Sequence, residues 1–190
     1  GDDVAWKRFK RLAIDFDLSI PDNYDKAVEL LDIDNFIDYI MLCIYVDMDD
    51  WPYNNWRAGR ERTARAKWRF YVWDAERSFG TDGKQMLGRQ KRVVTSNNLT
   101  QGALTSDAGI ARLFRSLMAN PEFRLRFADR VHKHYFNGGV LTDEHIAQRH
   151  RELTEQMKHV LPDMSPYIRQ RWIPNRRAIV MQQMASIGIQ

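Results

Sequence analysis

The sequence predicts a mainly α fold that contains one small β-hairpin. Most of the chain carries apolar residues at helical spacing, bounded by capping residues, glycine or proline. Only residues 56–59 and 67–73 combine alternating apolar and polar residues with the aromatic content that is typical of strands. A connection rich in arginine joins the two stretches. At 190 residues the chain has the length of one domain with a single core, so we expect residues 1–190 to form one domain.

Three helices are expected before the hairpin. The first covers residues 2–17, where basic residues face an apolar stripe, and the second covers residues 24–31 after the turn at Pro21. The third covers residues 34–46, with Asp34 as its N-cap. This third helix is apolar on most sides, which predicts a central and buried position.

The predicted hairpin carries a basic cluster. Its second strand alternates Trp68, Phe70 and Val72 with charged or polar residues, as a strand with one buried face does. The cluster could hold phosphate or a polyanion, and it could equally be a solvated hairpin tip. It consists of Arg57, Arg60, Arg62, Arg65, Lys67 and Arg69.

The second half of the chain is predicted to be a loop followed by helices. Residues 80–106 are polar and lack a sustained period, which indicates a long loop. A helix capped by Ser106 or Asp107 is expected to reach Met118. Further helices are expected at residues 120–136, 142–160, 165–172 and 175–187.

Composition, charge and residue spacing limit the classes of function that the chain can have. The net charge of +4 favours anionic partners, but no motif or basic recognition helix indicates nucleic acid. The single cysteine, Cys43, excludes a disulfide within the chain and is expected to be a buried, inert thiol. The apolar run 36–46 is short of the roughly twenty residues that span a membrane, so no span is expected. The five histidines lack zinc-binding spacing.

Residues 47–80 hold the candidate site. Asp50 and Asn55 have the spacing at which a phosphoryl-transfer loop places a proton-accepting carboxylate and a metal-binding carboxamide. Asp74 follows the second strand, where a second metal-binding Asp is expected. Hard oxygen ligands of this kind suit magnesium or manganese. The same residue types would also suit Asx turns between a helix and a strand.

Two groups of short motifs occur in order along the chain. The N-terminal group is Asn35-Phe36-Ile37-Asp38-Tyr39, Asp50-Trp51, Asn54-Asn55-Trp56, Lys67-Trp68-Arg69-Phe70, Trp73-Asp74 and Ser78-Phe79-Gly80. The C-terminal group is Leu113-Phe114, Asn120-Pro121-Glu122-Phe123, Arg126-Phe127, Ile168-Arg169 and Arg171-Trp172. In this order the motifs resemble the CotH family of spore-coat-type atypical protein kinases.

The resemblance implies a kinase-like fold that uses ATP and a divalent metal to phosphorylate Ser or Thr of a secreted or coat protein, in the extracellular space or cell envelope. It makes Asp50 the catalytic carboxylate and places Asn54 and Asn55 at the metal and nucleotide. Asp74 becomes the principal metal ligand. Glu76 stands where the family commonly has a second Asp, which changes the reach of that carboxylate.

The part of the kinase-like fold that covers the nucleotide is not recognisable in the sequence. Residues before Asp34 offer no β-rich, glycine-bearing segment with the Lys that such folds need. The chain resembles the C-terminal lobe, whose partner would be the missing N-terminal lobe of a longer parent. We therefore expect no phosphate transfer by these 190 residues alone.

The alternative function is a non-catalytic adhesion or binding module. On the same scaffold, Trp51, Tyr53 and Trp56 would be presented with the basic cluster to a glycan, a polyanion or a protein. Large aromatic residues are also typical of a hydrophobic core, so these three residues could lie either in the core or at a binding surface.

Overall fold

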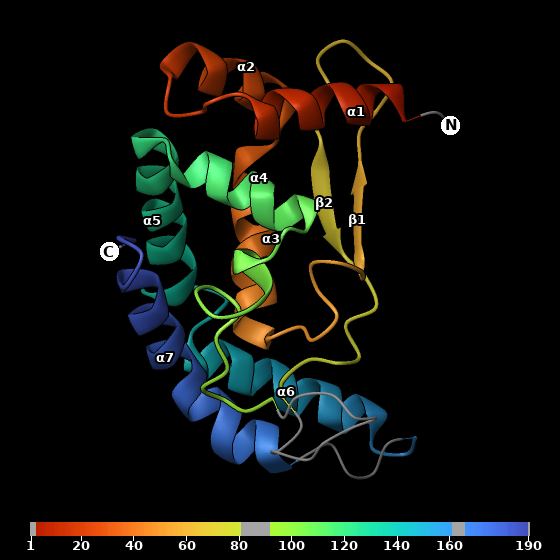
Figure 1. Ribbon diagram of the computed structural model, residues 1–190. Coiled ribbons are helices and arrows are strands. Elements are labelled where there is room, and N and C mark those ends of the chain that lie inside the picture. The colour runs from red at the N-terminus through yellow and green to blue at the C-terminus, as the bar shows by residue number, and fades with distance from the viewer. Residues whose placement is uncertain (1–2, 81–91, 161–165, 190) are drawn as a thin grey trace.

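The computed structural model describes residues 3–80, 92–160 and 166–189 of the chain. Within these ranges it has seven α-helices and one antiparallel sheet of two strands, which agrees with the predicted mainly α class. Figure 1 shows α3 (Ile33–Val46) along the centre of the molecule, with the hairpin on one side and the helices of residues 121–135 and 173–185 on the other. The helix of residues 143–157 lies across the lower end. Every helix in the described ranges is too short or too polar to cross a bilayer.

The central position of α3 follows from its sequence. Ten of its fourteen residues are buried, because apolar side chains occupy nearly every face of the helix. Its N-cap is Asp32, whose side chain accepts a hydrogen bond from the Asn35 N–H at 3.1 Å, and so the prediction of Asp34 as cap was wrong. Asp34 instead lies in the first turn and pairs with Arg126.

The first two helices lie across one end of α3. The first is α1 (Val4–Lys10), which continues as a π-helical segment, Arg11–Asp15, so regular α-helix ends well before residue 17. The second is α2 (Pro21–Leu30), which begins earlier than predicted because Pro21 suits the first helical turn. Asp2 lies outside the described residues.

The hairpin packs between α1 and α3. Strand β1 (Trp56–Gly59) has the predicted bounds, whereas β2 (Arg69–Val72) is shorter than the predicted 67–73. Trp68 instead forms a parallel bridge with Leu31 at the end of α2. The inner face of the hairpin meets Trp6 of α1, which contacts the rings of Trp56, Trp68 and Phe70.

Helices α4 (Gly109–Met118) and α5 (Pro121–Tyr135) follow the predicted order. Ala108 caps α4 without a side-chain hydrogen bond, so neither Ser106 nor Asp107 is the cap. Asn120 caps α5, and its side chain accepts a hydrogen bond from the Glu122 N–H at 2.8 Å. The preceding residues, 92–108, contain only a 3-10 turn at Ala103–Thr105; the rest of the predicted loop, 81–91, lies outside the described residues.

The last two helices pack against each other, and the final one also contacts α3. Helix α6 (Asp143–Met157) ends before the predicted residue 160. A π-helical segment, Ile168–Trp172, runs directly into α7 (Ile173–Ala185), so the two helices expected at 165–172 and 175–187 are one continuous helical segment. Pro174 lies where the π-helical segment passes into the first turn of α7.

Candidate functional site

The site segment begins with a buried acid at the end of α3. Asp47 is the C-cap, in a left-handed conformation with φ of 55°, and is fully buried. Both carboxylate oxygens accept hydrogen bonds from Arg92, one of them at 2.7 Å from Nε. Arg92 also donates to Asn98, which in turn donates to the Met48 carbonyl. This network fixes the chain at the point where it leaves the helix.

A second buried arginine, Arg176 of α7, caps the same end of α3. Its guanidinium donates to the Ile44 and Tyr45 carbonyls at 2.5 and 2.9 Å and to two carbonyls of the segment 94–96. It also lies 3.9 Å from Asp47 and stacks on the Trp172 ring. Burial lowers the pKa of Arg176, and the Asp47 carboxylate opposes this shift. Arg176 thereby supplies donors to two of the last carbonyls of α3, and the Phe79 N–H donates to the carbonyl of Val46.

Asp50, the predicted catalytic carboxylate, stands beside Arg77. One Arg77 nitrogen donates to Asp49, and another lies 3.7 Å from Asp50 Oδ1. The Asp49 N–H donates to the Arg77 carbonyl at 3.1 Å, so the chain on either side of the hairpin is held together at this point. All three side chains are largely buried, with 16 to 22 per cent of their surface exposed. Arg77 therefore pairs with both carboxylates, through a hydrogen bond to Asp49 and a longer ion pair with Asp50.

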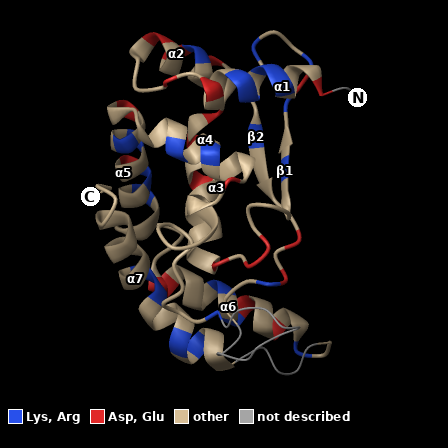
Figure 2. Ribbon diagram, in the orientation of Figure 1, with Lys and Arg blue, Asp and Glu red and all other residues tan. Residues whose placement is uncertain are grey.

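The other predicted residues lie at the two ends of the hairpin. Asn55 precedes β1 and Asp74 follows β2, both in the left-handed conformation, with φ of 58° and 56°. Figure 2 shows Asp and Glu gathered in the two loops at this end of the strands, and Lys and Arg at the opposite tip and on α1. The hairpin thus separates an acidic end from a basic end.

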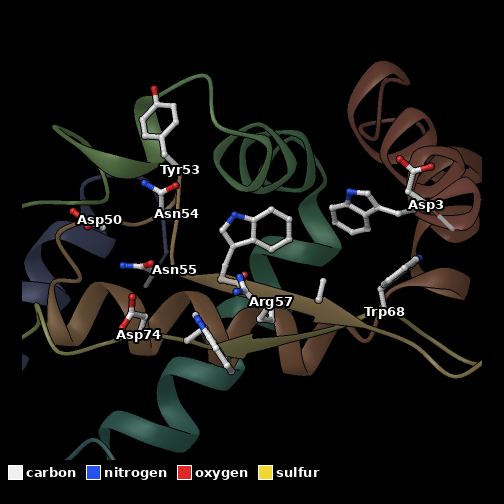
Figure 3. Close-up of a pocket in the computed structure, with 12 residues that line it drawn as sticks. Asp3, Asp50, Tyr53, Asn54, Asn55, Arg57, Trp68 and Asp74 are labelled. Carbon is white, nitrogen blue, oxygen red and sulfur yellow. The ribbon is translucent and has the colours of Figure 1, made fainter. Parts of the chain in front are cut away.

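One open cavity of about 750 Å³ collects four of the five predicted site residues. Asp50, Asn54, Asn55 and Asp74 all contribute to its wall, and Figure 3 shows Asn55 between Asp50 and Asp74. Glu76 is exposed and does not belong to the cavity wall. The remaining wall consists of Asp3, Trp6, Tyr53, Trp56, Arg57, Ala58, Trp68 and Trp73.

The donor set of this cavity suits a hard cation that keeps other ligands. Two carboxylates and two carboxamides offer oxygen atoms, the ligands that magnesium and manganese prefer. Within the described ranges, no three His, Cys, Asp or Glu side chains come together closely enough to hold a metal by themselves. Magnesium commonly takes one or two carboxylates and completes its shell with water and phosphate, so the residues present fit that mode.

The aromatic residues proposed for ligand stacking divide between core and surface. Trp51 is only 2 per cent exposed and donates from Nε1 to the Tyr39 hydroxyl at 2.6 Å, so it cannot be presented to a glycan. Tyr53 is 66 per cent exposed and Trp56 is half-buried. Trp73, which sequence reasoning did not select for stacking, is 52 per cent exposed and carries Arg57 over its ring.

Most of the basic cluster is exposed, but several of its members have partners. Arg60 lies over the Trp68 ring and bonds to backbone carbonyls of its own loop. Lys67 donates to the Val28 carbonyl at 2.7 Å, and Arg69 pairs with Asp32 at 3.4 Å. These contacts favour the interpretation of the cluster as a solvated hairpin tip that is anchored to α2 and α3.

Sequence reasoning missed the three arginines that hold the site segment. Arg77, Arg92 and Arg176 lie 27, 42 and 126 positions beyond Asp50 in the numbering, and none belongs to the Asp and Asn pattern that drew attention to the site. Only Arg77 had a local signal, since it follows the conspicuous Asp74 and Glu76 within the same segment. The others become recognisable once α7 and residues 92–98 are seen to pack against the end of α3.

The fold and the cavity define a mainly α protein with paired carboxylates and carboxamides at the base of a hairpin. A family model described as CotH kinase protein matches residues 2–171. The chain therefore belongs to the CotH kinase protein family, which confirms the resemblance seen in the motifs. No curated protein and no solved structure was found to match the sequence.

Proposed function

We propose that this chain carries the carboxylate-bearing part of an ATP-dependent site that phosphorylates Ser or Thr of a secreted or coat protein. The observation that carries the proposal is the shared cavity, in which Asp50, Asn54 and Asn55 from one end of the hairpin meet Asp74 from the other. The phosphoryl-transfer template needs these residue types in this order along the chain. Membership in the CotH kinase protein family supports the use of ATP.

The residues divide into two roles. Asp50 would accept the proton of the substrate hydroxyl, with Arg77 holding its orientation. Asn55 and Asp74 would hold a magnesium or manganese ion, with Asn54 beside the nucleotide and Glu76 as an outer ligand. Such an ion supplies positive charge that offsets the charge of the phosphates. Glu76 lies outside the cavity wall, so its replacement should weaken metal binding less than replacement of Asp74.

We propose further that the described helices correspond to the C-terminal lobe of a protein-kinase-like fold. The order of central helix, loop, hairpin and acid supports this assignment. Residues 3–46, all within the described ranges, are largely helical and contain no β-strand with the Lys and glycine loop that would cover a nucleotide. A separate N-terminal lobe is therefore the proposed partner. We also propose that the longer parent protein works in the extracellular space or cell envelope.

A titration tests the metal and nucleotide roles. Trp56 and Trp73 line the cavity, so their fluorescence should report the binding of a non-hydrolysable ATP analogue with magnesium or manganese. In Asp74→Asn the charge is lost, while a residue that favours left-handed backbone is kept. We expect at least a tenfold loss of metal-dependent affinity in this variant, and no loss in Asp107→Ala, an exposed acid before α4.

Two results would contradict the proposal. The site assignment fails if metal-dependent nucleotide binding, or activity of the parent, survives replacement of both Asp50 and Asp74 by Ala. The assignment of a partial site fails if the 190 residues by themselves phosphorylate a Ser-rich peptide efficiently. Neither result depends on knowing the natural substrate.

The second candidate is a non-catalytic binding module, favoured by the exposure of Tyr53 and Trp73 beside the cavity. Because Trp51 is buried, the rings of Tyr53 and Trp73 would form the stacking surface for a glycan or a partner protein. Glycan binding that is lost in Tyr53→Ala with Trp73→Ala, and is unchanged in Asp74→Asn, would favour this function over phosphoryl transfer.

A further inference from the structure

The two edges of the hairpin sheet differ in their hydrogen bonding. The outer edge of β2 is occupied, because the Asn35 side chain donates to the Phe70 carbonyl at 3.2 Å and accepts from its N–H at 2.6 Å. At the nearby residue Trp68, the backbone N–H donates to the Leu30 carbonyl, and the backbone carbonyl accepts from the Asp32 N–H. Among the described residues, β1 pairs only with β2, so its other edge has no strand beside it.

The register shows which groups of β1 face this unpaired edge. Ala58 is opposite Phe70, whose N–H and carbonyl both point toward Asn35 and away from β1. In an antiparallel pair, a residue opposite such a position also directs both backbone groups outward. Ala58 therefore turns its N–H and carbonyl to the open edge, and so does Trp56, opposite Val72.

The cavity extends along this edge. Residues 54–58 all line it, although successive strand residues point to opposite faces of a sheet. An unbroken run of lining residues is expected where a cavity follows the edge of a strand. Figure 3 shows the direction of the groove, from Asp50, Asn55 and Asp74 at one end of the hairpin to Trp68 and Asp3 at the other.

We propose that the edge of β1 binds an extended peptide segment as a third strand of the sheet. The outward N–H and carbonyl of Ala58 and the outward N–H of Trp56 have the spacing that the backbone of another strand complements. The Trp56 carbonyl accepts from the Arg57 side chain at 2.9 Å, and that side chain can move because it is exposed. Exposed strand edges are binding templates unless the fold protects them.

The direction of the groove connects this edge to the proposed chemistry. A peptide paired with Ala58 and continued past Trp56 enters the acidic end of the cavity, where Asp50 and Asp74 lie. If the proposed phosphoryl transfer is correct, β pairing would thus present a Ser or Thr of the substrate to Asp50. The substrate class is then an unfolded, strand-forming segment recognised through its backbone.

A peptide-binding experiment without metal or nucleotide tests the edge. The probe is a capped, fluorescein-labelled peptide of nine alternating Ser and Val residues, measured by fluorescence anisotropy. Ala58→Pro removes only an outward N–H and leaves the ladder to β2 complete, since proline is tolerated on such an edge. The matched control is Ala64→Pro, the same change in the exposed tip of the hairpin.

We expect binding to weaken at least tenfold in Ala58→Pro and to stay within twofold in Ala64→Pro. A peptide whose five central amides are N-methylated should bind the original chain at least tenfold more weakly than the probe. Equal binding of the probe to Ala58→Pro and to the original chain overturns the proposal, as does the lack of any binding at millimolar peptide.

Amide hydrogen exchange gives a readout that needs no variant. The Ala58 amide should exchange rapidly in the free chain and at least tenfold more slowly with saturating peptide, whereas the Arg57 amide, which faces β2, should be protected in both. Protection of Ala58 by the ATP analogue but not by peptide would assign the edge to the nucleotide and overturn the proposal. Peptide binding is measured without metal or nucleotide, and nucleotide binding is measured without peptide, so failure of the edge and failure of the phosphoryl site are distinguishable.

Discussion

At the level of single residues, the left-handed backbone conformation recurs around the site. Asp47, Asn55 and Asp74 adopt it at the end of α3, before β1 and after β2. Asn and Asp tolerate this conformation better than other residues with a side chain. They also carry the oxygen atoms that bind hard cations. The Asx-turn interpretation and the metal-site interpretation of these residues are therefore compatible, because the same residue types serve both.

The lowered pKa of His134 predicts how the stability of the folded chain depends on pH. Burial lowers the pKa of His134 below its ordinary value of 6.5, with Arg130 adding to the shift and Asp38 opposing it. The unfolded chain therefore binds a proton at a higher pH than the folded chain. The free energy of unfolding should decrease as pH falls from about 6.5 through the folded-state pKa.

Urea denaturation at a series of pH values measures this effect. In His134→Gln the decrease should be smaller, although His150, whose pKa is also lowered by burial, will keep part of it. His132→Gln, an exposed neighbour on the same helix, is the matched control and should leave the pH profile unchanged. An identical profile in His134→Gln and the original chain would contradict the assignment.

At the level of elements, the Asn35 side chain is the link between α3 and the hairpin. It takes the place of a strand backbone along β2, through two hydrogen bonds to Phe70. The sequence could not indicate this role, since an Asn in the first turn of a helix is usually interpreted as part of the cap. Phe70, which this link holds, is the residue opposite Ala58 in the hairpin.

Asn35→Ala should destabilise the chain by about 1–3 kcal/mol, because a backbone N–H and a carbonyl of β2 lose their partner. The midpoint of urea denaturation measures the change. The control is Asn175→Ala, where an exposed side chain makes one local hydrogen bond and the expected effect is within about 0.5 kcal/mol. Similar effects of the two substitutions would show that the link carries little stability.

At the level of the whole molecule, Arg176 joins segments that are far apart in the chain. It extends from α7 to the last carbonyls of α3, to residues 94–96 and to the surroundings of Asp47. The position of the site segment therefore depends on the last helix. The local sequence of residues 47–80 carries no sign of this dependence.

Arg176→Met should destabilise the chain by about 3–5 kcal/mol, because it removes a buried guanidinium that donates to four carbonyls, among them those of Ile44 and Tyr45 at the end of α3. Arg171→Met, an exposed arginine in the adjoining π-helical segment, is the control and should change stability by less than about 0.5 kcal/mol. Thermal and urea denaturation measure both. A change below about 1 kcal/mol in Arg176→Met would show that the end of α3 does not depend on this arginine.

Local patterns in the sequence were sufficient to predict the order of the elements and the place of the hairpin, through helical spacing before Val46 and alternation around Phe70. The family followed from short motifs spread over most of the chain, and the acids and amides within residues 47–80 selected the candidate site. The central burial of α3 could be predicted because apolar side chains occupy nearly every face of the helix.

Which of these residues meet became evident only from the packing of the folded chain. Asp50 and Asp74 share one cavity, Glu76 lies outside its wall, Trp51 is buried, and the edge of β1 forms a wall of the groove. The physical reason is that these outcomes depend on how the hairpin packs on α3. They also depend on the hydrogen bonds that Arg92 and Arg176 donate at the end of that helix. Contacts of this kind join residues that no local pattern connects.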